Sequence, residues 1–146
     1  MKRGFTLIEL IIVIIIVGIL AAVGISQYST TVEKSRIAEA KIRIGVMRQL
    51  AYEYYLNNGS LTGITNSDLG VDDTCTSAGF YRYNIWGVPS DSITLRAIRC
   101  QSGGKTPDCS YFYGIYMTYY PGTDQGVWHC YLAGYTGPCF GMAPYP

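Results

Sequence analysis

The feature that most constrains this chain is an uncharged, apolar run that follows a short basic leader. No charged residue lies between Glu9 and Glu33, and residues 10–25 carry no polar side chain. The stretch from residue 5 to residue 25 contains 21 residues. As an α-helix it is about 30 Å long, the thickness of the hydrocarbon core of a bilayer. The sequence therefore predicts a membrane-spanning helix at residues 5–25.

The charges before the apolar run predict its orientation in the membrane. The pattern after it predicts whether the segment is cleaved off or retained. Lys2 and Arg3 favour a cytoplasmic N-terminus, because basic residues beside a membrane helix tend to stay on the cytoplasmic side. A secretory signal peptide has an apolar core of only about 7–15 residues and ends at a small-residue cleavage site. Here the run is longer and continues into a helical pattern. We therefore expect the helix to be retained and the remainder of the chain to be translocated.

One carboxylate interrupts the apolar stretch. Glu9 would cost about 2.5–3.5 kcal/mol at the centre of a bilayer, so its presence needs an explanation. One interpretation is a position near the membrane interface, where the carboxylate only complements the positive N-terminus of the helix. The other interpretation is a function that requires a carboxylate among apolar side chains. Position alone leaves both open.

Residues Gly4–Leu10, which read GFTLIEL, resemble the class III signal of type IV pilins and of the related secretion pseudopilins. The resemblance covers roughly residues 3–25. It implies that a prepilin peptidase cuts between Gly4 and Phe5 and methylates the new N-terminal amine of Phe5. It also implies that Glu9 is the carboxylate used in filament assembly.

The chain departs from this family in one respect. Many members carry a proline about where Ser26 lies, and there it bends or loosens the helix. In this sequence only Gly18, Gly24 and Ser26 are weak helix formers in that region. A smooth helix and a loosened one both remain open.

An amphipathic pattern follows the apolar run. Apolar residues recur at 3-4-3-4-3 spacing, which predicts a helix with one buried face: Ile37, Ala40, Ile44, Met47, Ala51 and Tyr54. The sequence Asn57-Asn58-Gly59 predicts the end of that helix. The expected organisation is a leader at 1–4, a helix at 5–58 (5–25 transmembrane, 26–58 amphipathic) and a disulfide-containing globular β domain at 59–146.

Alternating apolar and polar residues in the C-terminal half predict strands. We expect them at residues 81–85, 93–97, 111–120 and 127–132, after a polar connecting loop at 59–79. An antiparallel sheet of three or four strands packed on the C-terminal half of the helix would bury the apolar positions of both. The predicted fold class is α+β, which agrees with the pilin resemblance.

The cysteines predict disulfides and an oxidising compartment. All five lie in the C-terminal half, at spacings that fit neither a structural zinc site nor a C-x-x-C redox pair: Cys75, Cys100, Cys109, Cys130 and Cys139. We expect Cys130 to pair with Cys139, because the intervening residues include two glycines and a proline and because pilins typically have a C-terminal disulfide loop. Cys100–Cys109 has the same spacing and is the second choice, which would leave Cys75 as the odd cysteine.

No pattern in the sequence points to an enzyme, a cofactor or a metal. The single His129 alternates with Trp128 and Cys130, as expected for a surface strand. Asp68, Asp72 and Asp73 lack the spacing of a calcium loop, so turn chemistry explains them better. The 14 tyrosines are expected in the core and on exposed binding surface rather than in electron transfer.

These observations predict a structural protein. Side-chain charges nearly cancel, at 11 Lys+Arg against 10 Asp+Glu, so the charge balance does not favour nucleic acid as a partner. The resemblance implies a type IV pilus subunit that is made in the bacterial inner membrane, processed by prepilin peptidase, and exported by pilus assembly machinery as a homopolymer on the cell surface. The alternative is a pseudopilin of a type II secretion system. A third possibility is a signal-anchored binding module that never polymerises.

Overall fold

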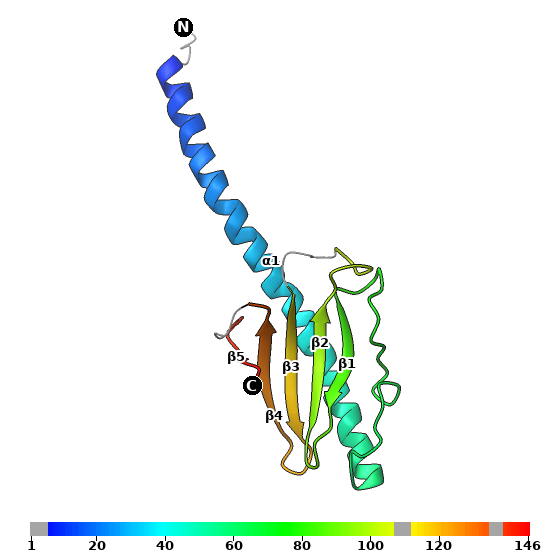
Figure 1. Cartoon of the computed structure of the whole chain (residues 1–146). Coiled ribbons are helices and arrows are strands. Elements are labelled where there is room, and N and C mark those ends of the chain that lie inside the picture. Colours follow the sequence, from blue (N-terminus) through cyan, green and yellow to red (C-terminus); the bar gives the residue numbers. More distant parts are fainter. Residues whose placement is uncertain (1–5, 107–111, 135–138) are drawn as a thin grey trace. The chain divides into compact units, whose positions relative to one another are not determined.

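The structure, a computed structural model, describes residues 6–106, 112–134 and 139–146, apart from the side chains of residues 26, 29 and 30. In these residues one helix is followed by five strands, which confirms the predicted α+β class (Figure 1). The chain divides into two units, one that ends at Ser35 and one that begins at Arg36. Helix α1 (Leu7–Asn58) contributes residues to both units, so the second unit contains the sheet and the C-terminal part of the helix.

The first unit presents an apolar helix surface that is exposed among the described residues. Its segment Leu7–Ile25 contains 19 residues, has a mean hydropathy of 3.1 and is 0% buried. By length and composition this segment can cross a membrane, as the sequence predicted. A continuous apolar surface of this size is stable only against lipid or against other protein.

The C-terminal end of α1 follows from its last residues. Gly59 has a φ of 70°, a left-handed conformation that glycine adopts without steric cost. Its N–H donates to the carbonyl of Tyr55 at 2.8 Å, and Asn58 Nδ2 donates to the carbonyl of Tyr54 at 2.9 Å. These bonds satisfy two of the carbonyls that a helix end leaves without partners. The predicted stop signal is confirmed.

The second unit contains a single five-stranded sheet whose spatial order follows the sequence. Its strands are β1 (Tyr81–Gly87), β2 (Ile93–Arg99), β3 (Tyr113–Tyr120), β4 (Gln125–Leu132) and β5 (Ala143–Pro144). The first four pair antiparallel, as predicted. The two-residue strand β5 pairs parallel with β4 and was not predicted, because two residues carry no readable periodicity.

The core of the second unit lies between the sheet and the apolar stripe of α1. Ile37, Ala40, Ile44, Met47 and Ala51 are all buried, which confirms the predicted buried face. They join the buried alternate residues of β2 and β3, namely Ile93, Leu95, Ala97, Tyr113, Ile115, Met117 and Tyr119. Fully burying one side chain of the size of Ile or Leu stabilises a fold by about 1.5–3 kcal/mol, so this interface accounts for much of the unit's stability.

The loop between α1 and β1 is held by side-chain hydrogen bonds. Asp68 accepts hydrogen bonds at 2.7 Å from both the N–H and the hydroxyl of Thr65, and these bonds lower the pKa of its carboxyl. Asp73 accepts a bond from Asn84 Nδ2 at 2.7 Å and pairs with Arg82 at 3.2 Å. Within the described part of the chain, no group of three or more His, Cys, Asp or Glu side chains could hold a metal ion. Asp68 thus takes part in a turn, as predicted, and Asp73 connects the loop to β1.

Candidate functional site

Glu9 and Thr6 form a reciprocal cap at the start of α1. Glu9 Oε2 accepts hydrogen bonds from the N–H of Thr6 at 2.8 Å and from its hydroxyl at 2.6 Å. In return the N–H of Glu9 donates to Thr6 Oγ1 at 3.4 Å. A threonine followed three residues later by a glutamate is the capping-box arrangement, which satisfies N–H groups that the first turn of a helix leaves without partners.

This geometry gives Glu9 a role within its own helix. In the single chain its carboxylate caps its own helix, so Glu9 has a local partner in Thr6. Both hydrogen bonds reach Oε2, and Oε1 accepts none from the residues that the structure describes. The predicted processing residues, Gly4 and Phe5, lie outside the described residues.

The structure joins Cys130 to Cys139, the pairing that the sequence and the pilin resemblance favoured. It also joins Cys75 to Cys100, with 5.9 Å between the Cα atoms. The second choice, Cys100–Cys109, and the expectation that Cys75 would be odd are therefore wrong. Cys109 lies outside the described residues.

The physical reason for the Cys75–Cys100 pair is the register of β1 and β2. Tyr81 lies opposite Arg99, so the antiparallel pairing places the residue before β1 beside the residue after β2. The N–H of Cys100 accordingly donates to the carbonyl of Phe80 at 3.0 Å. The loop that carries Cys75 ends at this same point. A sequence argument that had paired the two predicted strands could have found this disulfide.

The Cys130–Cys139 bond lies beside the C-terminal segment. The N–H of Tyr145 donates to the carbonyl of Cys130 at 2.8 Å, and the Tyr145 ring lies 4.4 Å from that of Tyr116 on β3. His129 meets the edge of Tyr145 at 5.9 Å, and its Nδ1 lies 3.3 Å from the carbonyl of Pro144. His129 thus lies on strand β4, as predicted, and contacts the C-terminal segment.

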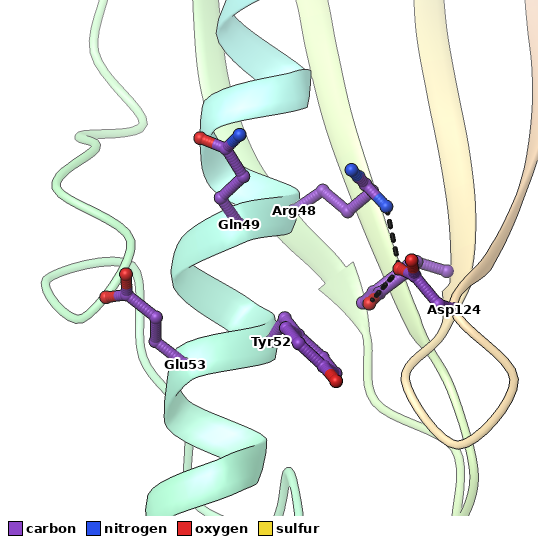
Figure 2. A pocket seen from close by; sticks show the side chains of 6 residues that line it. Arg48, Gln49, Tyr52, Glu53 and Asp124 are labelled. Carbon is purple, nitrogen blue, oxygen red and sulfur yellow. Dashed lines mark hydrogen bonds and ion pairs between the residues drawn. The ribbon is translucent and has the colours of Figure 1, made fainter.

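A polar hollow of about 420 Å³ lies between α1 and the β3–β4 turn (Figure 2). At its side, Arg48 Nη1 and the Tyr119 hydroxyl both donate to Asp124 Oδ1, each at 2.8 Å. Burial of the phenol, its hydrogen bond to Asp124 and the negative charge of Asp124 raise the pKa of Tyr119 to about 12. Gln49, Tyr52 and Glu53 complete the lining.

The ion pair of Arg48 with Asp124 ties the β3–β4 turn to the helix. Asp124 has a φ of 51°, a conformation that non-glycine residues adopt only when the surrounding structure holds them there. Sequence analysis missed this cluster, because Arg48 and Asp124 are separated by 76 residues and neither belongs to a motif.

Comparison with known proteins links the N-terminal part of the chain to a family. Residues 1–25 match the family model of the prokaryotic N-terminal methylation motif. A fimbrial protein of Neisseria meningitidis serogroup B is 41% identical over 81 residues, which cover 56% of this chain and 47% of that protein. The type IV major pilin protein PilE of Neisseria gonorrhoeae is 40% identical over 81 residues, which cover 56% of this chain and 48% of that protein.

A probable minor fimbrial protein of Dichelobacter nodosus is 44% identical over 60 residues, which cover 41% of this chain and 37% of that protein. The chain thus spans about half the length, or less, of these curated relatives. No solved structure gives a significant match.

The methylation motif, the exposed apolar helix segment and the sheet packed on the same helix define a class of proteins with a pilin-like fold and an N-terminal methylation signal. Over the matched residues, the chain is similar to fimbrial proteins and to type IV major pilins.

Proposed function

We propose that this chain is a structural, non-enzymatic subunit of a type IV pilus filament. It is made as a precursor in the bacterial inner membrane, with its N-terminus in the cytoplasm, and is exported by pilus assembly machinery to the cell surface as a homopolymer. The observation that carries this proposal is the segment Leu7–Ile25, which is 0% buried in the chain itself. The same surface suits lipid before assembly and identical helices afterwards.

Processing by prepilin peptidase is the first step of the proposal. Cleavage between Gly4 and Phe5 removes Lys2 and Arg3 together with the leader. The 11 basic side chains become 9, so the side-chain charge of the mature chain is 9 − 10 = −1. Cleavage also creates an amine on Phe5, four residues before Glu9. Support comes from the methylation motif that spans both residues.

Apolar packing supplies the cohesion of the proposed filament, and Glu9 supplies register. The attraction between an amine and a carboxylate in a low-dielectric environment is strong, but loss of hydration cancels much of it. Glu9 Oε2 is already bound by Thr6, which leaves Oε1 for the Phe5 amine of an incoming subunit. The carboxylate then fixes where that subunit stops, while residues 7–25 provide the contact area.

Two substitutions at Glu9 separate this role from simple helix capping. Glu9→Gln keeps an oxygen that accepts the Thr6 bonds, since glutamine also fits the capping box, but it removes the charge. Glu9→Val removes both. We expect both variants to be cleaved and inserted normally and to yield no homopolymeric filaments, as judged by electron microscopy and mass spectrometry of sheared filaments.

Each other outcome has a definite meaning. Normal filament numbers in Glu9→Gln would show that Glu9 acts only as a cap and not through its charge. Absence of filaments from the unaltered chain, in a cell with the assembly machinery, would contradict the filament function itself and favour a membrane-anchored binding module. Intact mass should place the mature N-terminus at a methylated Phe5, and Met1 retained in filaments would exclude the processing step.

The names of the reported relatives support a pilus over a secretion pseudopilin. They are described as fimbrial proteins and as a type IV major pilin, and their match covers the proposed filament-forming helix. The two functions differ in their product, so recovery of long filaments sheared from the cell surface tests the choice directly.

A further inference from the structure

One face of the sheet is turned away from the part of α1 that packs on it (Figure 1). Successive residues of a strand point to opposite faces, so the residues that alternate with the buried core of β2 and β3 lie on this outer face. One row crosses four strands there. Asn84 on β1 pairs with Arg96 on β2, which pairs with Tyr116 on β3, which in turn pairs with His129 on β4. The row brings hydrogen-bonding groups and rings together on one surface.

Arg96 in this row carries a positive charge among uncharged neighbours. Its Nε donates to Asn84 Oδ1 at 2.8 Å, and its guanidinium lies 4.0 Å from the centroid of the Trp86 ring. The Tyr116 phenol beside it is also uncharged, since burial raises its pKa. Among the residues that the structure describes, no carboxylate forms an ion pair with Arg96. A guanidinium that is stacked on a ring and hydrogen-bonded at one edge has a fixed orientation.

The carboxylate in the same hydrogen-bonded network is paired with a different arginine. Asn84 Nδ2 donates to Asp73 Oδ2 at 2.7 Å, and Arg82 Nη1 lies 3.2 Å from Asp73 Oδ1. The network that ends at Arg96 therefore has two guanidinium groups and one carboxylate. Its excess positive charge is at Arg96, on the side of the Trp86 ring. Arg96 is only partly exposed, so water screens this charge less than it would at an open surface.

Trp86 presents an open ring beside this charge. It is 53% exposed, although its ring meets that of Tyr116 edge to face, with centroids 6.4 Å apart. Tyr145 lies against Tyr116 and extends the aromatic surface. Gly114 lets the Tyr116 ring lie close to the sheet, because a Cβ at Gly114 would be 2.9 Å from Tyr116 Cε2. These contacts fix the rings before any ligand binds, which lowers the entropic cost of binding. We call Trp86, Arg96, Tyr116 and Tyr145 the aromatic platform.

We propose that the aromatic platform binds an acidic saccharide, with the sugar ring on Trp86 and its carboxylate at Arg96. The C–H groups on one face of a pyranose ring are weakly positive and suit the negative face of an indole ring. A hydrogen bond from a guanidinium to a carboxylate is stronger than a bond between neutral groups. A single copy of the chain contributes both parts of the site. The inference therefore goes beyond the proposed filament function and does not depend on assembly.

The charge of the aromatic platform favours an acidic saccharide over a nucleic acid. Nucleic-acid binding depends on several contacts of lysine and arginine with phosphates. Here one positive charge is in excess, and the carboxylate of Asp73 lies in the same network. A ligand that brings one carboxylate beside one sugar ring matches this balance.

Two tetrasaccharides test the proposal on the unaltered, detergent-solubilised full chain. The acidic probe is a hyaluronan tetrasaccharide, in which glucuronate alternates with N-acetylglucosamine. The neutral probe is chitotetraose, which consists of N-acetylglucosamine alone. We expect isothermal titration calorimetry to show roughly ten-fold tighter binding of the acidic probe, the effect of one charged hydrogen bond. The difference should shrink in about 1 M salt.

Two substitutions separate the ring from the charge. Trp86→Ala removes the open ring and should weaken the binding of both probes by roughly five-fold. Arg96→Gln removes the charge but keeps an amide that can donate to Asn84, and it should reduce the difference between the probes to less than about two-fold. The matched controls are Tyr52→Ala and Arg48→Gln, which remove an exposed ring and a guanidinium from the hollow beside α1. We expect both controls to bind the probes as the unaltered chain does.

The other outcomes each overturn the proposal. Equal affinity of the unaltered chain for the two probes would exclude recognition of the carboxylate, and no binding of either probe would exclude the site. Equal losses in the platform variants and in the controls would show that the saccharide binds elsewhere. An oligothymidylate that binds more tightly than the acidic tetrasaccharide, and loses affinity in Arg96→Gln, would assign the aromatic platform to nucleic acid. All of these results leave the filament function intact, because that function is measured on sheared filaments.

Discussion

The hydroxyls of Tyr81 and Tyr113 lie 2.7 Å apart in the core of the second unit. Their rings meet edge to face, with centroids 6.1 Å apart and an interplanar angle of 73°. Tyr81 belongs to β1 and Tyr113 to β3, so the pair reaches across β2. Because it is buried, this hydrogen bond contributes more than a surface bond would.

Loss of this hydroxyl pair should destabilise the domain measurably. Tyr81→Phe removes one partner of a buried hydrogen bond, and the expected cost is about 1–3 kcal/mol of unfolding free energy. Urea unfolding of the detergent-solubilised full chain measures it. Tyr131→Phe is the control, since Tyr131 is 42% exposed and should change the free energy by less than about 0.5 kcal/mol. Equal effects in both variants would contradict the importance of the pair.

The buried stripe of α1 should tolerate truncation poorly. Ile44 is 0% exposed, and Ile44→Ala leaves a cavity between helix and sheet that should cost about 2–5 kcal/mol. Ile42→Ala, on the same helix but 72% exposed, should cost less than about 1 kcal/mol, mainly through side-chain packing lost at the surface. Similar midpoints of thermal unfolding for the two variants would show that the helix does not pack on the sheet as described.

Tyr119 should make the domain sensitive to alkaline pH. Its pKa of about 12 in the folded state is above the value of about 10 for an unfolded tyrosine, so the folded state favours the protonated phenol. The stabilisation that the protonated Tyr119 phenol gives the folded state is complete below pH 10. It is lost as the pH rises towards 12. Tyr119→Phe should flatten that part of the stability profile, measured by urea unfolding at several pH values. If the unfolding free energy of the variant falls with rising pH as steeply as that of the unaltered chain, Tyr119 is not the source of the alkaline sensitivity.

The two disulfides should contribute unequally. Their sequence separations are 9 residues for Cys130–Cys139 and 25 for Cys75–Cys100. Chain-entropy arguments give about 2.5–3 kcal/mol for the shorter loop and about 3.5 kcal/mol for the longer one. Paired Cys→Ser replacement at each bridge, followed by unfolding measurements, tests the order. Non-reducing peptide mapping tests the pairing first, and a Cys100–Cys109 peptide would overturn it.

Local patterns made most of the fold predictable. The spacing of Ile37, Ala40, Ile44 and Met47 is itself the geometry of a helix face, and strand alternation likewise reports which side chains share a face. Contacts between distant segments were not predictable in this way. The bond of Arg48 to Asp124 and the Cys75–Cys100 bridge depend on how the strands pair, which single-residue patterns do not encode.

Thr6 and Glu9 show a different limit of prediction from sequence. Their spacing is a recognisable capping box, yet the family resemblance directed attention to a partner in another subunit. The structure shows that a residue with a proposed assembly role also has a local one. Local chemistry has to be worked out before a family role is assigned, even where the motif is specific.

Both lateral edges of the sheet are occupied in the described part of the chain. On the β1 side, Asn66 Oδ1 accepts the N–H of Ile85 at 2.9 Å, and on the β4 side β5 pairs at His129 and Cys130. An uncovered edge strand is a template for pairing with strands of other molecules, the route to amyloid-like aggregates. A subunit concentrated enough to polymerise is especially exposed to that hazard. These contacts cover part of each edge and so reduce the backbone that is open to pairing with a strand of another molecule.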